Sequence, residues 1–186
     1  MRHIHEIGES MNMRFSHSAV LAFLATLALG GLALAQTITL GATLQLTGSL
    51  ANTGRYYQDA FQVAVDAINA QGGVTVGDQT YQLKLDILDN QSDSNLAVRQ
   101  TTQLITQDKV DFLLGPYASD FVLVTSAIAE KYGVPMIEGG GASNEIFSRG
   151  YKNIFGTLPG ASDYFSSTIT MMGKLDPPAS SIALLF

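Results

Sequence analysis

The stretch YQLKLDILDNQSDSNLAVRQTTQLITQDKVDFLLGPYAS, residues 81–119, contains the structural unit from which the fold follows. Tyr81 to Leu88 alternates apolar and polar residues, which is typical of a β-strand with one covered face. Asn95 to Gln107 carries apolar residues at helical spacing, and Val110 to Leu114 is a short apolar run that ends at Gly115-Pro116. A strand, a helix and a second strand joined by short loops predict two parallel strands with a helix between them.

The same alternation continues on both sides of this unit. Before it, Ile38 to Leu44 reads as a buried strand, and Arg55 to Ala70 as a helix that Gly72-Gly73 ends. After it, Ser119 or Asp120 begins a helix that runs to about Lys131. The remaining expected elements are strands at Val134–Ile137, Tyr151–Thr157 and Ile182–Phe186, and a helix at Ser162–Met172. The predicted fold class is α/β, a parallel sheet with helices on both faces.

In a sheet of this kind, ligands bind outside the carboxyl ends of the strands. Four loops therefore become candidates, namely residues 45–53, 89–93, 115–119 and 138–144. Gly139-Gly140-Gly141 lacks the Gly-Lys-Ser/Thr of a phosphate-binding loop, so it is either a structural turn or a loop that lets a ligand approach the backbone. Ser119 caps its own helix, joins the helix amides in binding a carboxylate, or does both.

The first 35 residues have the parts of a secretory signal peptide. Arg14 precedes the apolar run Ala19 to Ala35, which ends in Ala33-Leu34-Ala35. Cleavage is predicted after Ala35, with the true start at Met11 or Met13 and a periplasmic or secreted mature protein. The alternative is an uncleaved membrane anchor, but the run is shorter than the roughly 20 residues that a spanning helix needs.

Composition excludes several classes of function. Ten Lys and Arg against 16 Asp and Glu give a net charge of −6, which argues against nucleic-acid binding. There is no Cys, and His3, His5 and His17 all lie before or at the start of the apolar run, so the mature part lacks the residues of a Ser-His-Asp triad, a Cys-His pair or a His-ligated zinc. No cofactor and no metal site are predicted.

Carboxylates are the remaining candidates for chemistry. Asp86, Asp89 and Asp93 lack the spacing of a calcium loop and are interpreted as solvated loop carboxylates. An enzyme that uses Asp89, Asp93 and Glu138 at the strand ends is kept as an alternative, although no acid/base pair stands out.

Three segments, in this order, resemble the branched-chain amino acid binding protein family of ABC importers. They are TGSLANTGRYYQDAFQVAVDAINAQGG (residues 47–73), DNQSDSNLAVRQTTQLITQDKVDFLLGPYAS (89–119) and YGVPMIEGGGASNEIFSRGYKNIFGTLP (132–159). The likeness runs from about Thr37 to Phe186. It implies the type I periplasmic binding fold, with residues 36–157 as the first lobe and 158–186 as the crossover and first elements of a second lobe that is expected to be incomplete.

The resemblance also implies non-catalytic capture of an amino acid or similar small polar solute, with ABC permease subunits as partners. A ligand-sensing domain of a receptor or regulator with the same fold is the alternative. In the family, a hydroxyl after the third strand holds the ligand's carboxylate, which matches Ser119. A second hydroxyl comes from the next loop, where an ungapped match places Ala142 and a shift of one residue places Ser143.

The other site residues follow from the same resemblance. A backbone carbonyl near Gly140 or Gly141 receives the ligand's ammonium group, and Tyr117 and Ala118 line the side-chain pocket. Thr53 stands where several family members carry an aromatic residue. The predicted ligand-binding set is Thr53, Tyr117, Ala118, Ser119, Gly140, Gly141, Ala142 and Ser143.

Overall fold

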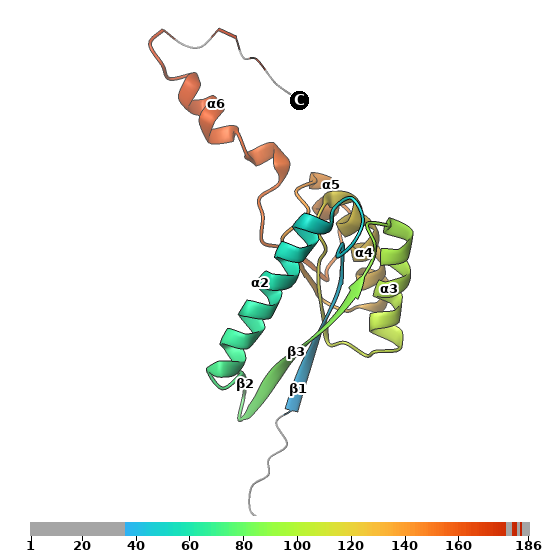
Figure 1. Cartoon of the computed structure of the whole chain (residues 1–186). Coiled ribbons are helices and arrows are strands. Elements are labelled where there is room, and N and C mark those ends of the chain that lie inside the picture. The colour runs from blue at the N-terminus through green and yellow to red at the C-terminus, as the bar shows by residue number, and fades with distance from the viewer. Residues whose placement is uncertain (1–35, 178–179, 182, 184–186) are drawn as a thin grey trace, which may run out of the picture. The chain divides into compact units, whose positions relative to one another are not determined.

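The computed structural model describes residues 36–177, 180–181 and 183, and within them the strands form one six-stranded sheet (Figure 1). The order across the sheet is β2-β3-β1-β4-β5-β6. Every neighbouring pair is parallel except β2 and β3, which are antiparallel at the edge. The strands are β1 (Gln36–Leu44), β2 (Val74–Val76), β3 (Gln79–Asp89), β4 (Phe112–Leu114), β5 (Met136–Glu138) and β6 (Ile154–Gly156). The predicted α/β class and parallel sheet are confirmed, with one antiparallel strand added.

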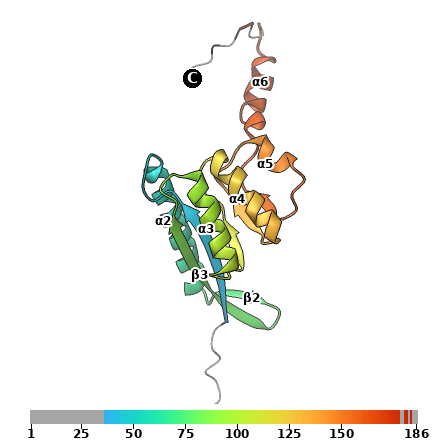
Figure 2. The ribbon, with the colours of Figure 1, turned by 90° about the vertical axis from the view of Figure 1, so that its right-hand side faces the viewer.

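Helices cover both faces of the sheet, as Figures 1 and 2 show. Helix α2 (Ala51–Ala70) packs on β3 and β1 from one side, and α3 (Ser94–Thr106) and α4 (Ser119–Tyr132) pack side by side on the other. Three shorter helices follow, α5 (Asn144–Ser148), η1 (Ala161–Asp163) and α6 (Ser166–Met172). No helix in residues 36–177 combines the length and the apolar character needed to cross a membrane.

The main apolar core lies between the sheet and the pair α3 and α4. Leu113 of β4 and Met136 of β5 are adjacent in the sheet and point to this side. They pack with Leu104 of α3, Ala129 of α4 and Val110, all of them buried. Complete burial of such side chains is the main source of stability in a sheet covered by helices.

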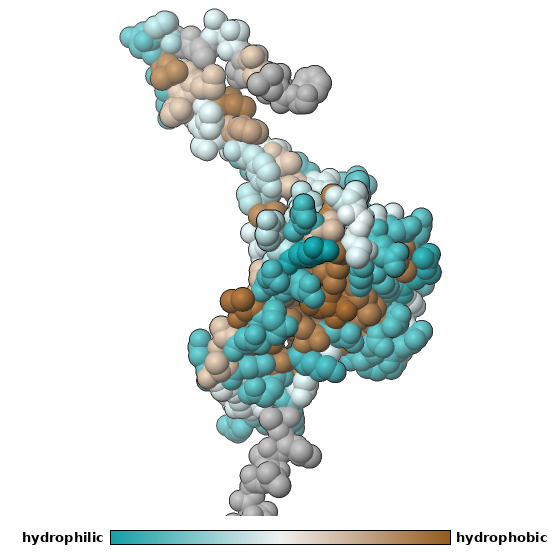
Figure 3. Space-filling view, in the orientation of Figure 1, coloured by the Kyte–Doolittle hydropathy of each residue, from teal (hydrophilic) through white to brown (hydrophobic). Residues whose placement is uncertain are grey.

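The opposite side of β4, β5 and β6 is less covered. Phe112, Ile137 and Phe155 alternate with the core residues on these strands and are 38%, 47% and 54% exposed. Figure 3 shows that apolar side chains also reach the surface in the middle of the molecule, between the positions of α2 and α3 in Figure 1.

The sequence predicted most elements, but several bounds differ. Helix α2 begins at Ala51 instead of Arg55, so Thr53 lies in its first turn instead of in a loop. The helix ends as predicted, because Gly72 and Gly73 have positive φ angles and Gly73 N donates to Ile68 O at 2.9 Å. The predicted helix 162–172 divides into η1 and α6.

Two predictions fall outside the described residues. They are the signal peptide in residues 1–35 and most of the strand expected at Ile182–Phe186.

Candidate binding site at the carboxyl edge of the sheet

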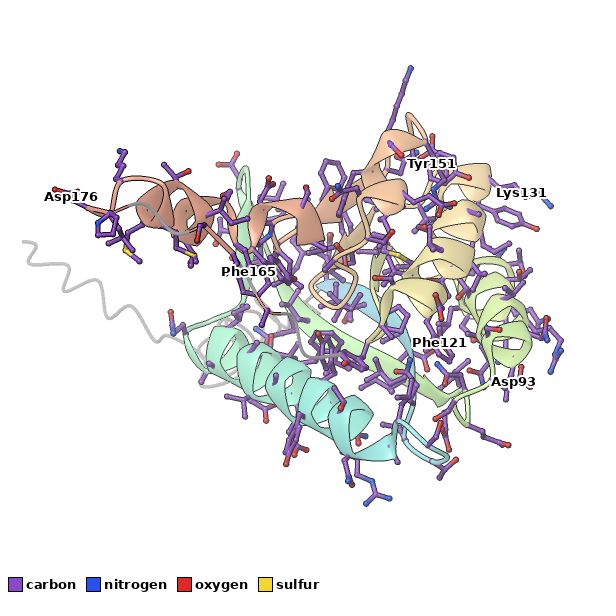
Figure 4. The ribbon with its side chains drawn as sticks, turned by 90° about the horizontal axis from the view of Figure 1, so that it is seen from above. Asp93, Phe121, Lys131, Tyr151, Phe165 and Asp176 are labelled. Atoms are coloured by element: carbon purple, nitrogen blue, oxygen red, sulfur yellow. The ribbon has the colours of Figure 1, made fainter. Side chains whose placement is uncertain are left out.

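The four predicted loops meet at the edge where β1, β3, β4 and β5 end. Figure 4 looks onto this edge and labels Asp93 beside the first turn of α3 and Phe121 in the first turn of α4. Parallel strands place their carboxyl ends at the same edge, so residues that are far apart in the sequence become neighbours there. Direct hydrogen bonds join the loops.

Asp89 ties the loop after β1 to the loop after β3. Its Oδ1 accepts from the backbone N–H groups of Leu46 (3.0 Å), Thr47 (3.1 Å) and Gln91 (2.8 Å), and its Oδ2 accepts from Thr47 Oγ1 (2.7 Å). Partial burial alone would raise the pKa of Asp89, but these hydrogen bonds stabilise the charged form and lower the pKa below its usual value. Asp89, at the end of β3, is therefore a partly exposed carboxylate, as predicted, which also joins the loops after β1 and β3.

A buried glutamine joins the loop after β1 to the loop after β4. Gln45 follows β1 directly, is fully buried, and donates from Nε2 to Tyr117 O at 2.7 Å. The neighbouring Gly54 of α2 lies against Gln45 O so closely that a Cβ there would overlap the carbonyl. The first turn of α2 is thus packed directly onto the end of β1.

The loops after β4 and β5 bond to each other through Ser119. Ala118 N donates to Gly140 O, and Ser143 N donates to Ser119 Oγ, both at 3.1 Å. The residue before α4 is Ala118, with φ 71° and ψ 139°, and the helix has no side-chain cap. The interpretation of Ser119 as the cap of its own helix is wrong, because its oxygen accepts from the neighbouring loop instead.

Ser143 and Ala142 have different surroundings. Ser143 precedes α5 and its Oγ accepts from Glu145 N at 3.3 Å. The carbonyl of Ala142 accepts from Ala161 N at 2.7 Å, which connects this loop to the segment after β6. Of the two residues considered for the second hydroxyl, the structure therefore places Ser143 directly beside Ser119.

The triple-glycine turn, Gly139–Gly141, is packed so closely by neighbouring residues that there is no room for side chains at Gly140 and Gly141. A Cβ on Gly140 would lie 2.5 Å from Pro116 O, and one on Gly141 would lie 3.0 Å from Val122 Cβ and overlap Ile146 Cδ1. Gly141 is buried and Gly140 is partly buried. These two glycines serve the packing of the turn, so the structural interpretation accounts for their lack of side chains.

Comparison with known proteins agrees with this architecture. A family model described as "Periplasmic binding protein" matches residues 37–185, most of the chain. The chain belongs to the periplasmic binding protein family. The resemblance drawn from the sequence to the branched-chain amino acid binding proteins of ABC transporters is confirmed by the relatives and by the solved structures that share the fold.

Three similar proteins illustrate the relationship. The Leu/Ile/Val-binding protein homologs 7 of Brucella abortus (strain 2308) and 8 of Brucella suis biovar 1 (strain 1330) are each 30% identical, over 76% and 90% of this chain. The substrate-binding protein LivJ of Streptococcus pneumoniae, solved in complex with isoleucine, is 32% identical with a TM-score of 0.61 over 73% of this chain. This periplasmic binding protein chain spans only 34%, 38% and 39% of their respective lengths.

In this periplasmic binding protein, Tyr57 of α2 also lies at the carboxyl edge of the sheet, although no sequence motif singled it out. Its hydroxyl donates to Gly139 O at 2.9 Å, and its ring lies 5.9 Å from that of Tyr117. Burial and then the nearby Glu138 raise the pKa of the Tyr57 phenol. Tyr117 and Ala118 lie beside Gly140 of the triple-glycine turn, and their role in a side-chain pocket stays a prediction. No hydrogen bond between described residues involves the Thr53 hydroxyl. Tyr57 precedes Phe61 by four residues, and their rings are neighbours on α2. This helical spacing is the same for a core residue and for a residue at the site, so the sequence could not tell the two apart.

The three carboxylates considered for catalysis are not brought together. Asp93 Oδ1 accepts from Leu96 N at 2.8 Å as the cap of α3, and Asp89 holds the loops after β1 and β3. Glu138 ends β5, three strand spacings or about 14 Å from the end of β3. Among the described residues, no three His, Cys, Asp or Glu side chains form a group that could hold a metal ion.

Proposed function

We propose that this chain is the ligand-binding lobe of an extracytoplasmic solute-binding protein of an ABC importer. The lobe takes an amino acid or a similar small polar solute and performs no chemistry on it. Support comes from the family, which consists of non-catalytic binding proteins, and from relatives that are named for Leu, Ile and Val or solved with isoleucine. We include a role in transport because LivJ, one of the similar proteins, is the substrate-binding protein of a branched-chain amino acid transporter.

The observation that carries the proposal is the hydrogen bond between Ser143 N and Ser119 Oγ. Ser119 Oγ accepts that bond, so its O–H proton can be donated to another acceptor. Ser143 Oγ likewise accepts from Glu145 N as the cap of α5, so the Ser143 O–H proton can also be donated. The ligand's carboxylate binds between these two hydroxyls, near the first turn of α4, where the helix dipole favours negative charge. Its ammonium group binds the carbonyl of Gly140 or Gly141.

Ligand capture then follows the hinge mechanism of two-lobed binding proteins. The first lobe covers residues 36–157, and the crossover and second lobe begin at residue 158. Closure of two lobes on the solute presents a compact form to the permease. Cleavage after Ala35 releases the mature protein outside the cytoplasm.

Isothermal titration calorimetry tests this function. The protein is expressed from the longest reading frame that contains these residues and titrated with a panel of L-amino acids and amides. We expect Ser119→Ala and Ser143→Ala each to weaken binding by about tenfold to a hundredfold, because each removes a hydrogen bond to a charged group. Thr80→Ala, which removes an exposed hydroxyl in the β2–β3 hairpin at the other end of the sheet, is the matched control.

Two results decide the proposal. Binding of at least one amino acid that is weakened by both serine variants and not by Thr80→Ala supports it. Failure of the unmodified protein to bind any member of the panel refutes it.

A further inference from the structure

Glu138 lies buried beneath the triple-glycine turn. Only 1% of this residue is exposed, and its Oε2 accepts from Gly140 N at 3.1 Å and from Gly141 N at 2.7 Å. Its Oε1 is buried and has no hydrogen-bond partner within the described residues. Both partners of the carboxylate are backbone amides rather than cations, so the side chain brings an uncompensated negative charge to the turn.

The same two amides connect Glu138 to the carbonyls of Gly139 and Gly140. In a trans peptide group the C=O points away from the N–H, so the Gly140 amide pairs with the Gly139 carbonyl, and the Gly141 amide with the Gly140 carbonyl. Gly139 O accepts from Tyr57 Oη and Gly140 O accepts from Ala118 N. Each carbonyl oxygen keeps a second lone pair, and a carboxylate at the N–H end of the peptide group makes that oxygen a stronger acceptor.

We propose that Glu138 is a specificity-determining residue, whose buried charge favours solutes with an ammonium group over solutes with a carboxylate alone. This inference rests on the proposed function, since it places the ammonium group at the carbonyls of the triple-glycine turn. The charge acts through the peptide groups of Gly140 and Gly141, in a medium of low dielectric constant.

A purely structural role would have a different consequence. If Glu138 only held the turn in shape, its loss would disturb every ligand of the loop alike. A role of the charge affects ligands according to their own charge, because an ammonium group is attracted and a lone carboxylate is repelled. The comparison of two ligands therefore separates the two roles.

Glu138→Gln removes the charge and keeps an oxygen that can accept from both glycine amides. The probes are L-leucine and 4-methylpentanoate, which is the same molecule without the amino group, titrated by calorimetry at pH 7.5. We expect the variant to lose about tenfold in leucine affinity and to bind 4-methylpentanoate unchanged or more tightly. Equal loss for both probes, or no loss for leucine, overturns the inference.

Glu130→Gln is the matched control. Glu130 also accepts from two backbone amides, Lys152 N and Asn153 N, but it lies in the last turn of α4, about 16 Å along the helix from Ser119. We expect this variant to keep the preference of the wild type for leucine. A fall in that preference equal to that of Glu138→Gln also overturns the inference.

A second measurement applies if Glu138→Gln does not fold. The titratable group near Glu138 is the Tyr57 phenol of α2, whose pKa is raised by burial and by Glu138; Tyr117 of the loop after β4 and Tyr164 lie near Tyr57. Burial raises the pKa of Glu138 above its usual value, so acidification from pH 8 to 4 should protonate it and lower the ratio of leucine to 4-methylpentanoate affinity, after correction for the ionised fraction of each probe. A constant ratio overturns the inference. If the wild type binds leucine and 4-methylpentanoate equally well, Glu138 has no such role, and the proposed function stands. If the wild type binds no amino acid, this inference and the proposed function both fail.

Discussion

Replacing Asp89 with alanine tests whether one carboxylate holds the loops after β1 and β3 together. The substitution removes four hydrogen bonds, of which three are exposed and the one from Leu46 N is partly buried. A bond to a charged group contributes about 1.5–3 kcal/mol when it is shielded from water. We take about 1.5 kcal/mol for the Leu46 bond and about 0.5 kcal/mol for each exposed bond, which gives about 3 kcal/mol in total.

The expected result is a lower melting temperature. For a chain of this size, a loss of about 3 kcal/mol corresponds to a fall of about 6–12 °C in Tm, measured by circular dichroism or differential scanning calorimetry. Asp89→Asn keeps an oxygen for the three amides and should lose less than about 1 kcal/mol. Asp78→Ala, at an exposed position in the β2–β3 turn, is the control and should leave Tm unchanged. If Asp89→Ala and Asp78→Ala melt at the same temperature, the loops do not depend on Asp89.

The pH dependence gives an independent check of the same carboxylate. Hydrogen bonds lower the pKa of Asp89 in the folded state, so its contribution to stability is present above its unfolded pKa of about 3.9 and is lost as the pH falls through the folded pKa. The difference in Tm between the wild type and Asp89→Ala should therefore be constant from pH 7 to 5 and shrink below about pH 4. A difference that stays the same at pH 3 would contradict the assignment of the charge.

Three further substitutions test the packing around the edge by urea denaturation. Gly54→Ala should destabilise the protein by about 1–3 kcal/mol or prevent folding, because the new Cβ overlaps Gln45 O; wild-type stability would show that α2 is not packed on β1 as described. Tyr57→Phe should cost about 1 kcal/mol through loss of the bond to Gly139 O, and an unchanged midpoint would mean that this bond contributes nothing. Leu104→Ala should cost about 2–5 kcal/mol as a fully buried core residue, whereas the exposed Leu175→Ala should have no effect; equal effects would contradict the assigned core.

Periodicity in the sequence predicted the fold well because both kinds of element show it strongly. The alternation in residues 81–88 and the helical spacing in residues 95–107 correspond to β3 and α3 within two residues at each end. The short elements β2 and α5 were missed, since three to five residues are too few to show a period. Strand β4 was predicted at Val110–Leu114 and is two residues shorter at its start. The apolar run does not show at which residue hydrogen bonding to the neighbouring strand begins.

The candidate site was predicted only in part. Motif order along the chain pointed to Ser119 and Ser143, and the structure places them beside each other. Residue identity alone did not show the contacts that depend on three-dimensional packing. The hydrogen bonds of Asp89 with Thr47 and of Tyr57 with Gly139 were not predicted, because the partners lie more than 40 residues apart in the sequence.

The backbone of Ala118 has a consequence for the cost of recognition. An alanine with φ 71° occupies a conformation that side chains disfavour by about 1–3 kcal/mol, and the bond from its N–H to Gly140 O holds it there. Folding therefore shapes this corner before any solute arrives, at the expense of stability. Under the proposed function, a solute that binds here would not have to order this part of the main chain, which leaves more of its contact energy to appear as affinity.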